Sequence, residues 1–226
     1  MFKDFKNLLF PKLCACCDQV LLKEEAFICT FCRHELPLYA NFFDGHHDLH
    51  KILYGRVQLE RAASLFYFEK KGPIQALIHD LKYRGNEELS FYLGSWLGEI
   101  LFEAGWKRSI DVVIPVPLHR QRMRERGYNQ VEGFGKAIAE KLSAKYIDTI
   151  LKRRSNSKTQ VFKSRTARSD VIGNNFYAEH LQELSSQHIL LVDDLVTTGA
   201  TLEACYLALN EAEGIKLNIA TMAITK

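Results

Sequence analysis

From Arg61 onward, the apolar residues of the chain follow two alternating patterns. Short apolar runs are typical of buried strands, and apolar residues three or four positions apart are typical of helices that cover a sheet. The runs predict strands over 62–68, 111–117, 146–151, 188–194 and 217–224. The helical spacing predicts helices over 73–83, 89–105, 129–142 and 199–213. At the start of the third helix, Asn129 and Glu132 have the spacing of a capping box.

Because strands alternate with helices, the pattern predicts an α/β fold with a parallel sheet and helices on both faces. The first fifty residues differ, since they have no clear period and hold most of the cysteines. We therefore expect a small cysteine-rich module over 1–50 and an α/β domain over 51–226. The polar segment 152–175 has no period and predicts a long loop.

Bulk composition narrows the class of protein. The chain has 226 residues, 47% of them hydrophobic, which suits an ordinary globular core. Its net charge of +3 is too small to indicate nucleic-acid binding by itself. No apolar run approaches the length of a membrane span, and the apolar patch before Pro11 is too short for the core of a signal peptide. We therefore expect a cytoplasmic protein without a transmembrane segment.

Five of the 6 cysteines lie between Cys14 and Cys32. Two pairs with CxxC spacing, Cys14 with Cys17 and Cys29 with Cys32, predict a tetrahedral four-sulfur site of the kind that Zn²⁺ favours. Four thiolates leave no open position for water, so the zinc would be structural. The alternatives are a disulfide pair and a redox CxxC motif. Cys16 is surplus and could compete with Cys14 or Cys17 for the metal.

The stretch ILLVDDLVTTGAT, residues 189–201, places Asp193 and Asp194 at the end of a buried strand. Parallel sheets bind ligands at this end of their strands. Gly199 allows the backbone to approach a ligand closely, and the N-terminus of the following helix attracts phosphate. Two carboxylates would repel a phosphate, so the ligand should also carry hydroxyl groups or a Mg²⁺ ion. A ribose 5-phosphate has a phosphate and a vicinal diol; the alternative is a solvated acidic turn.

The same stretch resembles the phosphoribosyl-pyrophosphate (PRPP) loop of type I phosphoribosyltransferases. The motifs CACC…CTFC, LIHDLKYRGN, DVVIPVPLHRQRMRERGYNQ and RRSNSKTQ occur in the same order as in the ComF family of competence proteins. The chain is similar to that family over nearly its whole length. The resemblance implies a parallel-sheet type I phosphoribosyltransferase fold with an N-terminal zinc ribbon.

The resemblance also implies roles for individual residues. Asp193 and Asp194 would bind the ribose hydroxyls and act as the catalytic residues, with Mg²⁺ accompanying PRPP. The loop IPVPLH (114–119), with Val116 and Pro117, would hold pyrophosphate. The 5-phosphate would bind at the turn made by Thr197, Thr198, Gly199, Ala200 and Thr201.

Basic residues gather in two segments. The first holds Arg120, Arg122, Arg124 and Arg126, and the second, 152–168, has seven Lys or Arg residues and no acid, among them Lys158, Arg165 and Arg168. Such runs are often solvated surface. They could also close over PRPP and neutralise pyrophosphate, or bind the backbone of single-stranded DNA while Tyr128 or Phe162 stacks on bases.

The resemblance implies a function in natural transformation. Incoming single-stranded DNA would be handled at the cytoplasmic side of the inner membrane, with PRPP, single-stranded DNA and other competence proteins as partners. One alternative is a metabolic phosphoribosyltransferase that transfers phosphoribose from PRPP to a nitrogen acceptor, and another is a binding module with a vestigial site. No general base or nucleobase pocket is identifiable, so enzymatic activity stays open.

Overall fold

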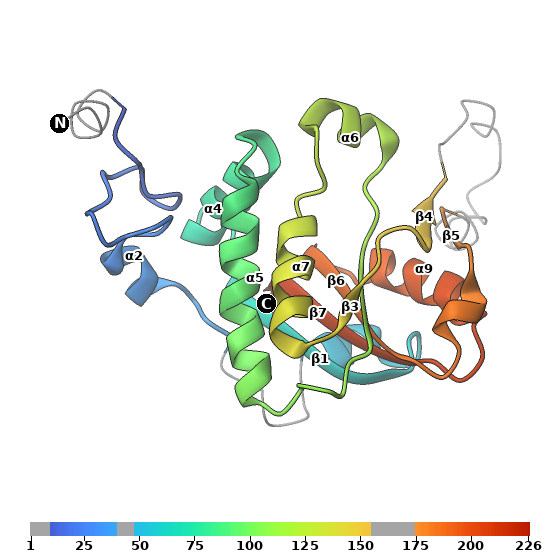
Figure 1. The fold of residues 1–226 in the computed structure, drawn as a ribbon. Coiled ribbons are helices and arrows are strands. Elements are labelled where there is room, and N and C mark those ends of the chain that lie inside the picture. The colour runs from blue at the N-terminus through green and yellow to red at the C-terminus, as the bar shows by residue number, and fades with distance from the viewer. Residues whose placement is uncertain (1–9, 40–47, 155–174) are drawn as a thin grey trace.

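The computed structural model describes residues 10–39, 48–154 and 175–226. Within them, the strands are β1 (Leu59–Phe68), β2 (Val112–Pro115), β3 (Lys145–Tyr146), β4 (Leu151–Arg153), β5 (Phe176–Ala178), β6 (His188–Val196) and β7 (Lys216–Thr225). The helices are α2 (Thr30–Glu35), α3 (Asp48–Leu53), α4 (Pro73–Tyr83), α5 (Glu87–Glu103), α6 (Arg120–Arg126), α7 (Glu132–Leu142), α9 (Ala200–Leu209) and the 3-10 helix η3 (Leu181–Leu184). Figure 1 shows how these elements are arranged.

Five of the described strands form a parallel sheet in the order β1-β7-β6-β2-β3. β6 lies between β7 and β2, so both of its edges are paired. Its residues 189–192 are fully buried, which is the pattern of a strand covered on both faces. The predicted parallel-sheet α/β fold is confirmed.

Helices cover both faces of the sheet, as predicted. On one face, α4, α5 and α7 pack on Leu190 and Val192 of β6. On the other face, α3, α9 and the antiparallel strands β4 and β5 pack on Ile189 and Leu191. α5 and α7 approach so closely that a Cβ atom at Gly94 would lie 2.4 Å from the carbonyl oxygen of Phe134. Only glycine fits there.

The capping box predicted at 129–142 is wrong. α7 begins at Glu132, and its N-cap, Val131, makes no capping hydrogen bond through its side chain. The Asn129 amide instead donates to the Val116 carbonyl oxygen at 3.0 Å and accepts from the Val131 backbone N–H at 3.4 Å. Asn129 therefore ties the segment before α7 to the loop that follows β2.

The strand predicted over 146–151 is also wrong, because the chain divides there between two sheets. β3 pairs with β2 in the parallel sheet, whereas β4 pairs antiparallel with β5. Ile150 and Leu151 are buried in the apolar cluster on the opposite face from α7, and this burial draws the chain out of the main sheet. β4 extends to Arg153, inside the segment 152–175 that was predicted as loop, and β5 and η3 follow that segment.

The cysteine-rich segment packs against α5. The ring of Phe27 lies 5.3 Å from that of Tyr92, and the Arg33 guanidinium lies 4.9 Å from the centre of the Trp96 ring. Cys14, Cys29 and Cys32 belong to the same apolar cluster as α4 and α5. Within the described ranges, the helices are too short or too polar to cross a lipid bilayer.

Candidate ligand site and metal centre

The acid pair lies near the carboxyl end of β6. β6 continues to pair with β7 as far as Val196, two residues beyond the predicted strand. Successive residues of a strand point to opposite faces, so Asp193 and Asp194 leave the strand in different directions. Asp194 is buried and Asp193 is partly exposed. Each carboxylate therefore has its own environment.

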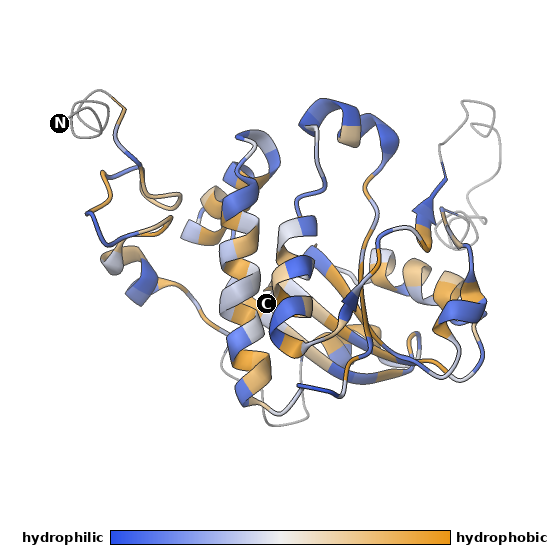
Figure 2. Cartoon of the chain, in the orientation of Figure 1, coloured by the Kyte–Doolittle hydropathy of each residue, from blue (hydrophilic) through white to orange (hydrophobic). Residues whose placement is uncertain are grey.

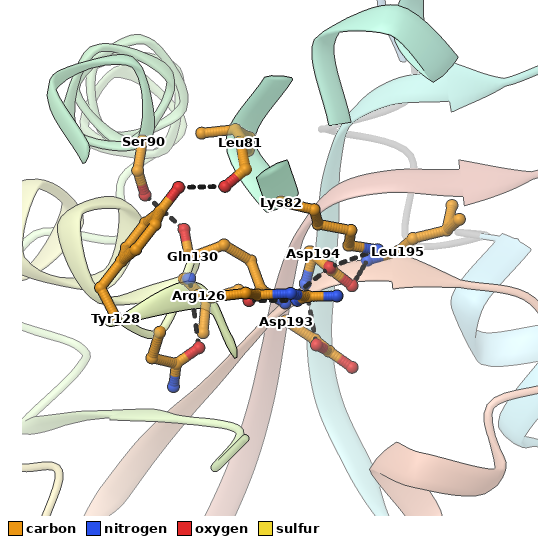
Figure 3. Close-up of polar contacts among 11 residues, drawn as sticks. Leu81, Lys82, Ser90, Arg126, Tyr128, Gln130, Asp193, Asp194 and Leu195 are labelled. Atoms are coloured by element: carbon orange, nitrogen blue, oxygen red, sulfur yellow. Dashed lines mark hydrogen bonds and ion pairs between the residues drawn. The ribbon is translucent and has the colours of Figure 1, made fainter. Parts of the chain in front are cut away.

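Asp194 is compensated by residues from two helical segments. The Lys82 ammonium, near the end of α4, lies 2.7 Å from Asp194 Oδ2. Gln130, just before α7, donates from its amide to the same oxygen at 2.8 Å. Figure 3 shows both side chains reaching Asp194. A buried carboxylate with a charged and a neutral donor is satisfied without a ligand.

Asp193 is less well compensated. Burial, and then the neighbouring Asp194 carboxylate, raises the pKa of Asp193 well above its ordinary value. The Asp194 backbone N–H, which donates to Asp193 Oδ1 at 2.8 Å, acts in the opposite direction, as do the charges of Lys82 and Arg153. The net shift of the Asp193 pKa is upward, so keeping this carboxylate ionised costs free energy. Hydroxyl groups of a ligand that donate to the carboxylate could offset that cost.

The turn after β6 has the geometry of an anion site. Gly199 is buried, adopts the left-handed conformation with φ of 74°, and is the N-cap of α9. Thr197 and Thr198 are exposed. Ala200 and Thr201 begin the helix, where backbone N–H groups have no partner within the helix. The turn can therefore offer backbone and hydroxyl donors to one anion.

Arg56, in the segment after α3, holds this turn from outside. Its guanidinium donates to the Thr198 carbonyl oxygen at 2.8 Å and pairs with Glu203 at 2.8 Å. Leu53 packs so closely that a Cβ atom at Gly199 would lie 2.6 Å from its Cδ2. The α3 segment thus fixes the turn before any ligand arrives.

The loop after β2 adjoins the acid pair. The Val116 backbone N–H donates to the Val192 carbonyl oxygen at 2.9 Å, one residue before Asp193. Pro117 follows and is partly exposed. The structure therefore brings together the predicted pyrophosphate loop and the predicted ribose-binding acids.

The first basic segment forms the helix α6, which the apolar pattern does not predict. Arg122 and Arg126 line a cavity of about 330 Å³ together with Lys82, Tyr83 and Glu125. Residues two apart on a helix differ by about 200° in direction, whereas residues four apart share a face. Arg120 and Arg124 therefore form a second pair on the other side of α6, where both are exposed. Figure 2 shows that α6 is mostly hydrophilic.

The remaining predictions for the basic segments have different outcomes. Lys158, Arg165 and Arg168, and the aromatic Phe162, lie outside the described residues. Tyr128 is buried, and its hydroxyl donates to the Leu81 carbonyl oxygen. The prediction that Tyr128 stacks on bases is therefore wrong, because its ring serves to join the segment before α7 to α4.

The four predicted cysteine ligands lie together. The sulfur atoms of Cys14, Cys17, Cys29 and Cys32 are all within 4.8 Å of one another, and those of Cys17 and Cys29 are 3.8 Å apart. Zn–S bonds of about 2.3 Å in a tetrahedron separate sulfur atoms by about 3.8 Å. The cluster could hold a metal ion of that size. Cys16 is not part of it, and His34 is exposed and pairs with Glu35.

Three residues of the ligand site were missed, Lys82, Gln130 and Arg56, and Arg153 was counted in the second basic segment without a role of its own. Lys82 and Gln130 lie in motifs that the resemblance singled out, LIHDLKYRGN and GYNQ, but neither received a role. Burial, and then the charge of Arg122, lowers the pKa of Arg153, and Asp193 opposes this shift, so Arg153 lies among these charges. Arg56 has no signal in the sequence, because only the tertiary fold brings it to the turn.

Comparison with known proteins agrees with this geometry. The Phosphoribosyl transferase domain matches residues 132–224, the part of the chain from α7 to β7. This match contains the acid pair and the turn 197–201. It does not include α4, β2 or α6, which supply the other walls of the site.

Three curated relatives are similar to the chain. Competence protein F of Haemophilus influenzae is 30% identical over 138 residues, and the match spans 58% of each chain. The DNA utilization protein YhgH of Salmonella typhi is 26% identical over 206 residues, which cover 86% of this chain and 89% of that protein. Competence protein ComFC of Bacillus subtilis is 26% identical over 191 residues, covering 84% of this chain and 75% of the relative. The domain, the relatives and the cysteine cluster together support the assignment of the chain to the ComF family of competence proteins.

Proposed function

We propose that the chain binds PRPP, or a closely related phosphoribosyl ligand, at the carboxyl end of the sheet. The 5-phosphate would bind at the turn 197–201, and the ribose hydroxyls would donate to Asp193 and Asp194. Pyrophosphate would occupy the side of the site formed by Val116, Pro117 and the cavity of α6. Mg²⁺ would enter with the pyrophosphate group, whose oxygens it prefers as ligands.

The observation that carries this proposal is the order of charges across the site. The turn 197–201 follows the two carboxylates along the chain, and a cavity lined by Lys82, Arg122 and Arg126 adjoins Asp194 through the Lys82 side chain. PRPP has the same order, with a phosphate, a diol and a pyrophosphate along one molecule. A ligand with only one anionic group would leave one side of the site without a partner.

We further propose that the protein handles incoming single-stranded DNA during natural transformation, at the cytoplasmic side of the inner membrane. The names of the relatives, which refer to competence and DNA utilization, support this role. The exposed pair Arg120 and Arg124 also supports it, because these residues lie away from the PRPP cavity and could contact a DNA backbone. In this proposal, residues 1–50 form a zinc ribbon that supports the domain at 51–226.

Calorimetry with PRPP and Mg²⁺ tests the ligand. The double variant Asp193→Asn, Asp194→Asn should lose binding while its fold persists, because amide groups cannot replace both acceptors. A matched control is Glu87→Gln, Glu88→Gln, which removes two adjacent, exposed carboxylates from the first turn of α5. Equal PRPP affinity in the acid-pair variant and the unmodified protein would show that the ligand binds elsewhere.

Transformation of a competent host tests the role in DNA uptake. Deletion of the protein should block transformation by linear DNA without blocking DNA capture at the cell surface. Complementation with the Asp193/Asp194 variant then reports whether the PRPP site matters to that role. Normal transformation in the deletion strain would refute the role, and exchange of labelled pyrophosphate into PRPP would then identify a transferase.

A further inference from the structure

Lys82 has an unusual position for a lysine. Its side chain is only 22% exposed, and its ammonium forms an ion pair with the buried carboxylate of Asp194. It reaches the site from α4, which lies outside the matched phosphoribosyl transferase domain at 132–224. The domain match therefore assigns it no role.

The end of α4 is held from two sides, which fixes the position of Lys82. On one side, the Leu81 carbonyl oxygen accepts the hydroxyl of Tyr128. On the other side, the Asn86 side-chain amide donates to the buried Asp80 carboxylate at 3.0 Å, and the Arg84 guanidinium forms an ion pair with that carboxylate at 3.3 Å. Because the backbone at Lys82 is fixed, its long side chain can move the ammonium between neighbouring partners without moving the helix.

A second possible partner of the Lys82 ammonium is an anion in the neighbouring cavity. Lys82 lines the cavity of about 330 Å³ with Arg122, Arg126 and a single acid, Glu125. Three cations and one carboxylate favour an anion in that cavity. Asp194 does not depend on Lys82 alone, because Gln130 donates to the same carboxylate oxygen.

We propose that Lys82 exchanges Asp194 for the pyrophosphate group when a phosphoribosyl ligand binds. This inference rests on the proposed function. Ribose hydroxyls that donate to Asp194 take over the compensation of its charge, and the released ammonium binds pyrophosphate oxygens in the cavity. Lys82 thereby links the two halves of the ligand, so ribose binding at the acids strengthens pyrophosphate binding next to them.

The exchange predicts a coupling that calorimetry can measure with two separate probes. The dissociation constant of magnesium pyrophosphate is measured with and without saturating ribose 5-phosphate. In the unmodified protein, ribose 5-phosphate should tighten pyrophosphate binding about tenfold, within the usual range of coupling between sites. In Lys82→Gln, pyrophosphate should bind more weakly and the coupling should vanish.

Two further variants separate this role from a structural one. Lys82→Arg keeps the charge and should restore part of the coupling. Lys136→Gln removes an exposed lysine that also pairs with a carboxylate, Glu132, and should behave as the unmodified protein does. If Lys82→Gln fails to fold, Lys82→Met, which keeps a side chain of similar length without the charge, takes its place in the same measurement.

The outcomes distinguish this inference from the proposed function. If the unmodified protein binds ribose 5-phosphate without any change in pyrophosphate affinity, the exchange is wrong and the PRPP site stands. Coupling that persists undiminished in Lys82→Gln also overturns the exchange. If the unmodified protein binds neither ribose 5-phosphate nor PRPP, the proposed function fails and the role of Lys82 fails with it.

Discussion

The cysteine cluster and the acid-pair site are built in opposite ways. The cluster takes all four sulfur atoms from residues 14–32 and gathers them within 4.8 Å. The acid-pair site takes its groups from α4, α6, β2, β6 and the segment before α7, and opens on a cavity. A closed set of like ligands suits a permanent ion, whereas an open set of mixed charges suits a ligand that comes and goes.

The two regions nevertheless share one helix. Arg84, just after α4, contacts Asp18, which follows Cys17 of the cluster, and Lys82 near the end of the same helix contacts Asp194. The Arg84 pair is exposed and by itself stabilises little. The comparison therefore predicts that damage to the cluster acts on the whole structure, while damage to the acid-pair site acts mainly on the ligand.

The largest effect is expected from the cluster. Cys14→Ser should remove the metal and destabilise the protein severely, because structural zinc contributes on the order of 10 kcal/mol to folding. Elemental analysis should find about one zinc per chain in the unmodified protein and much less in the variant. Cys16→Ser is the matched control, since Cys16 neighbours the cluster without belonging to it.

The control also tests the ligand assignment. Cys16→Ser should keep its zinc and its thermal stability. Loss of zinc from Cys16→Ser, with zinc retained in Cys14→Ser, would place Cys16 in the site instead of Cys14.

The next largest effect is expected at the turn 197–201, where we propose that the 5-phosphate binds. Gly199→Ala should destabilise the protein by about 2–3 kcal/mol, because a left-handed alanine costs about 1–2 kcal/mol and its Cβ would also press on Leu53. Gly127 has a similar φ of 81°, but nothing lies within 4 Å of an added Cβ. Gly127→Ala should therefore lose only the stability that the left-handed backbone conformation costs. Denaturant unfolding of the two variants gives the difference, and equal losses would mean that Leu53 moves freely.

The same comparison explains what the sequence could reveal. The strand at 188–196 and the cysteine cluster are encoded by neighbouring residues, so an apolar run and two CxxC spacings were enough to predict them. The parallel sheet with helices on both faces followed from the alternation of strands and helices. These features depend on local pattern, which a single sequence carries in full.

The failures have tertiary causes. The capping box failed because the Asn129 amide is used by the Val116 carbonyl oxygen, which lies in another segment. The strand at 146–151 failed because Ile150 is buried on the opposite face of the sheet. Lys82 was missed because an ion pair between α4 and β6 leaves no periodic signal in either segment.

A smaller effect is expected from the two arginine pairs of α6. Arg122→Gln with Arg126→Gln should weaken PRPP binding about tenfold, the effect of about 1.4 kcal/mol. Arg120→Gln with Arg124→Gln should leave PRPP binding unchanged and instead flatten the salt dependence of single-stranded DNA binding by about 1.4 in logarithmic slope, for two lost phosphate contacts. Each double variant is the control of the other. If the Arg120/Arg124 variant has an unchanged salt slope, DNA binds at another surface.

The smallest effect concerns the pH dependence of stability. Burial and the Asp194 carboxylate raise the pKa of Asp193 in the folded protein above its unfolded value of about 3.9. The folded state therefore binds this proton more tightly, and the stability that the proton contributes is lost as pH rises from about 4 through the raised pKa. Asp193→Asn removes that loss. In buffer without Mg²⁺ or PRPP, the variant should be more stable than the unmodified protein by on the order of 1 kcal/mol above the raised pKa, and the difference should shrink toward pH 5.

The control for this measurement is Asp148→Asn, which replaces an exposed carboxylate between β3 and β4. It shares any pH dependence that comes from the cysteine ligands, so the difference between the two variants isolates Asp193. Denaturant unfolding from pH 5 to pH 8.5 gives both curves. A constant gap between Asp193→Asn and the control across this range would mean that the folded protein does not hold Asp193 in a strained, partly protonated state. The ionised acid pair would then not destabilise the fold in the absence of its ligand, and the contrast with the closed cysteine cluster would be smaller than we propose.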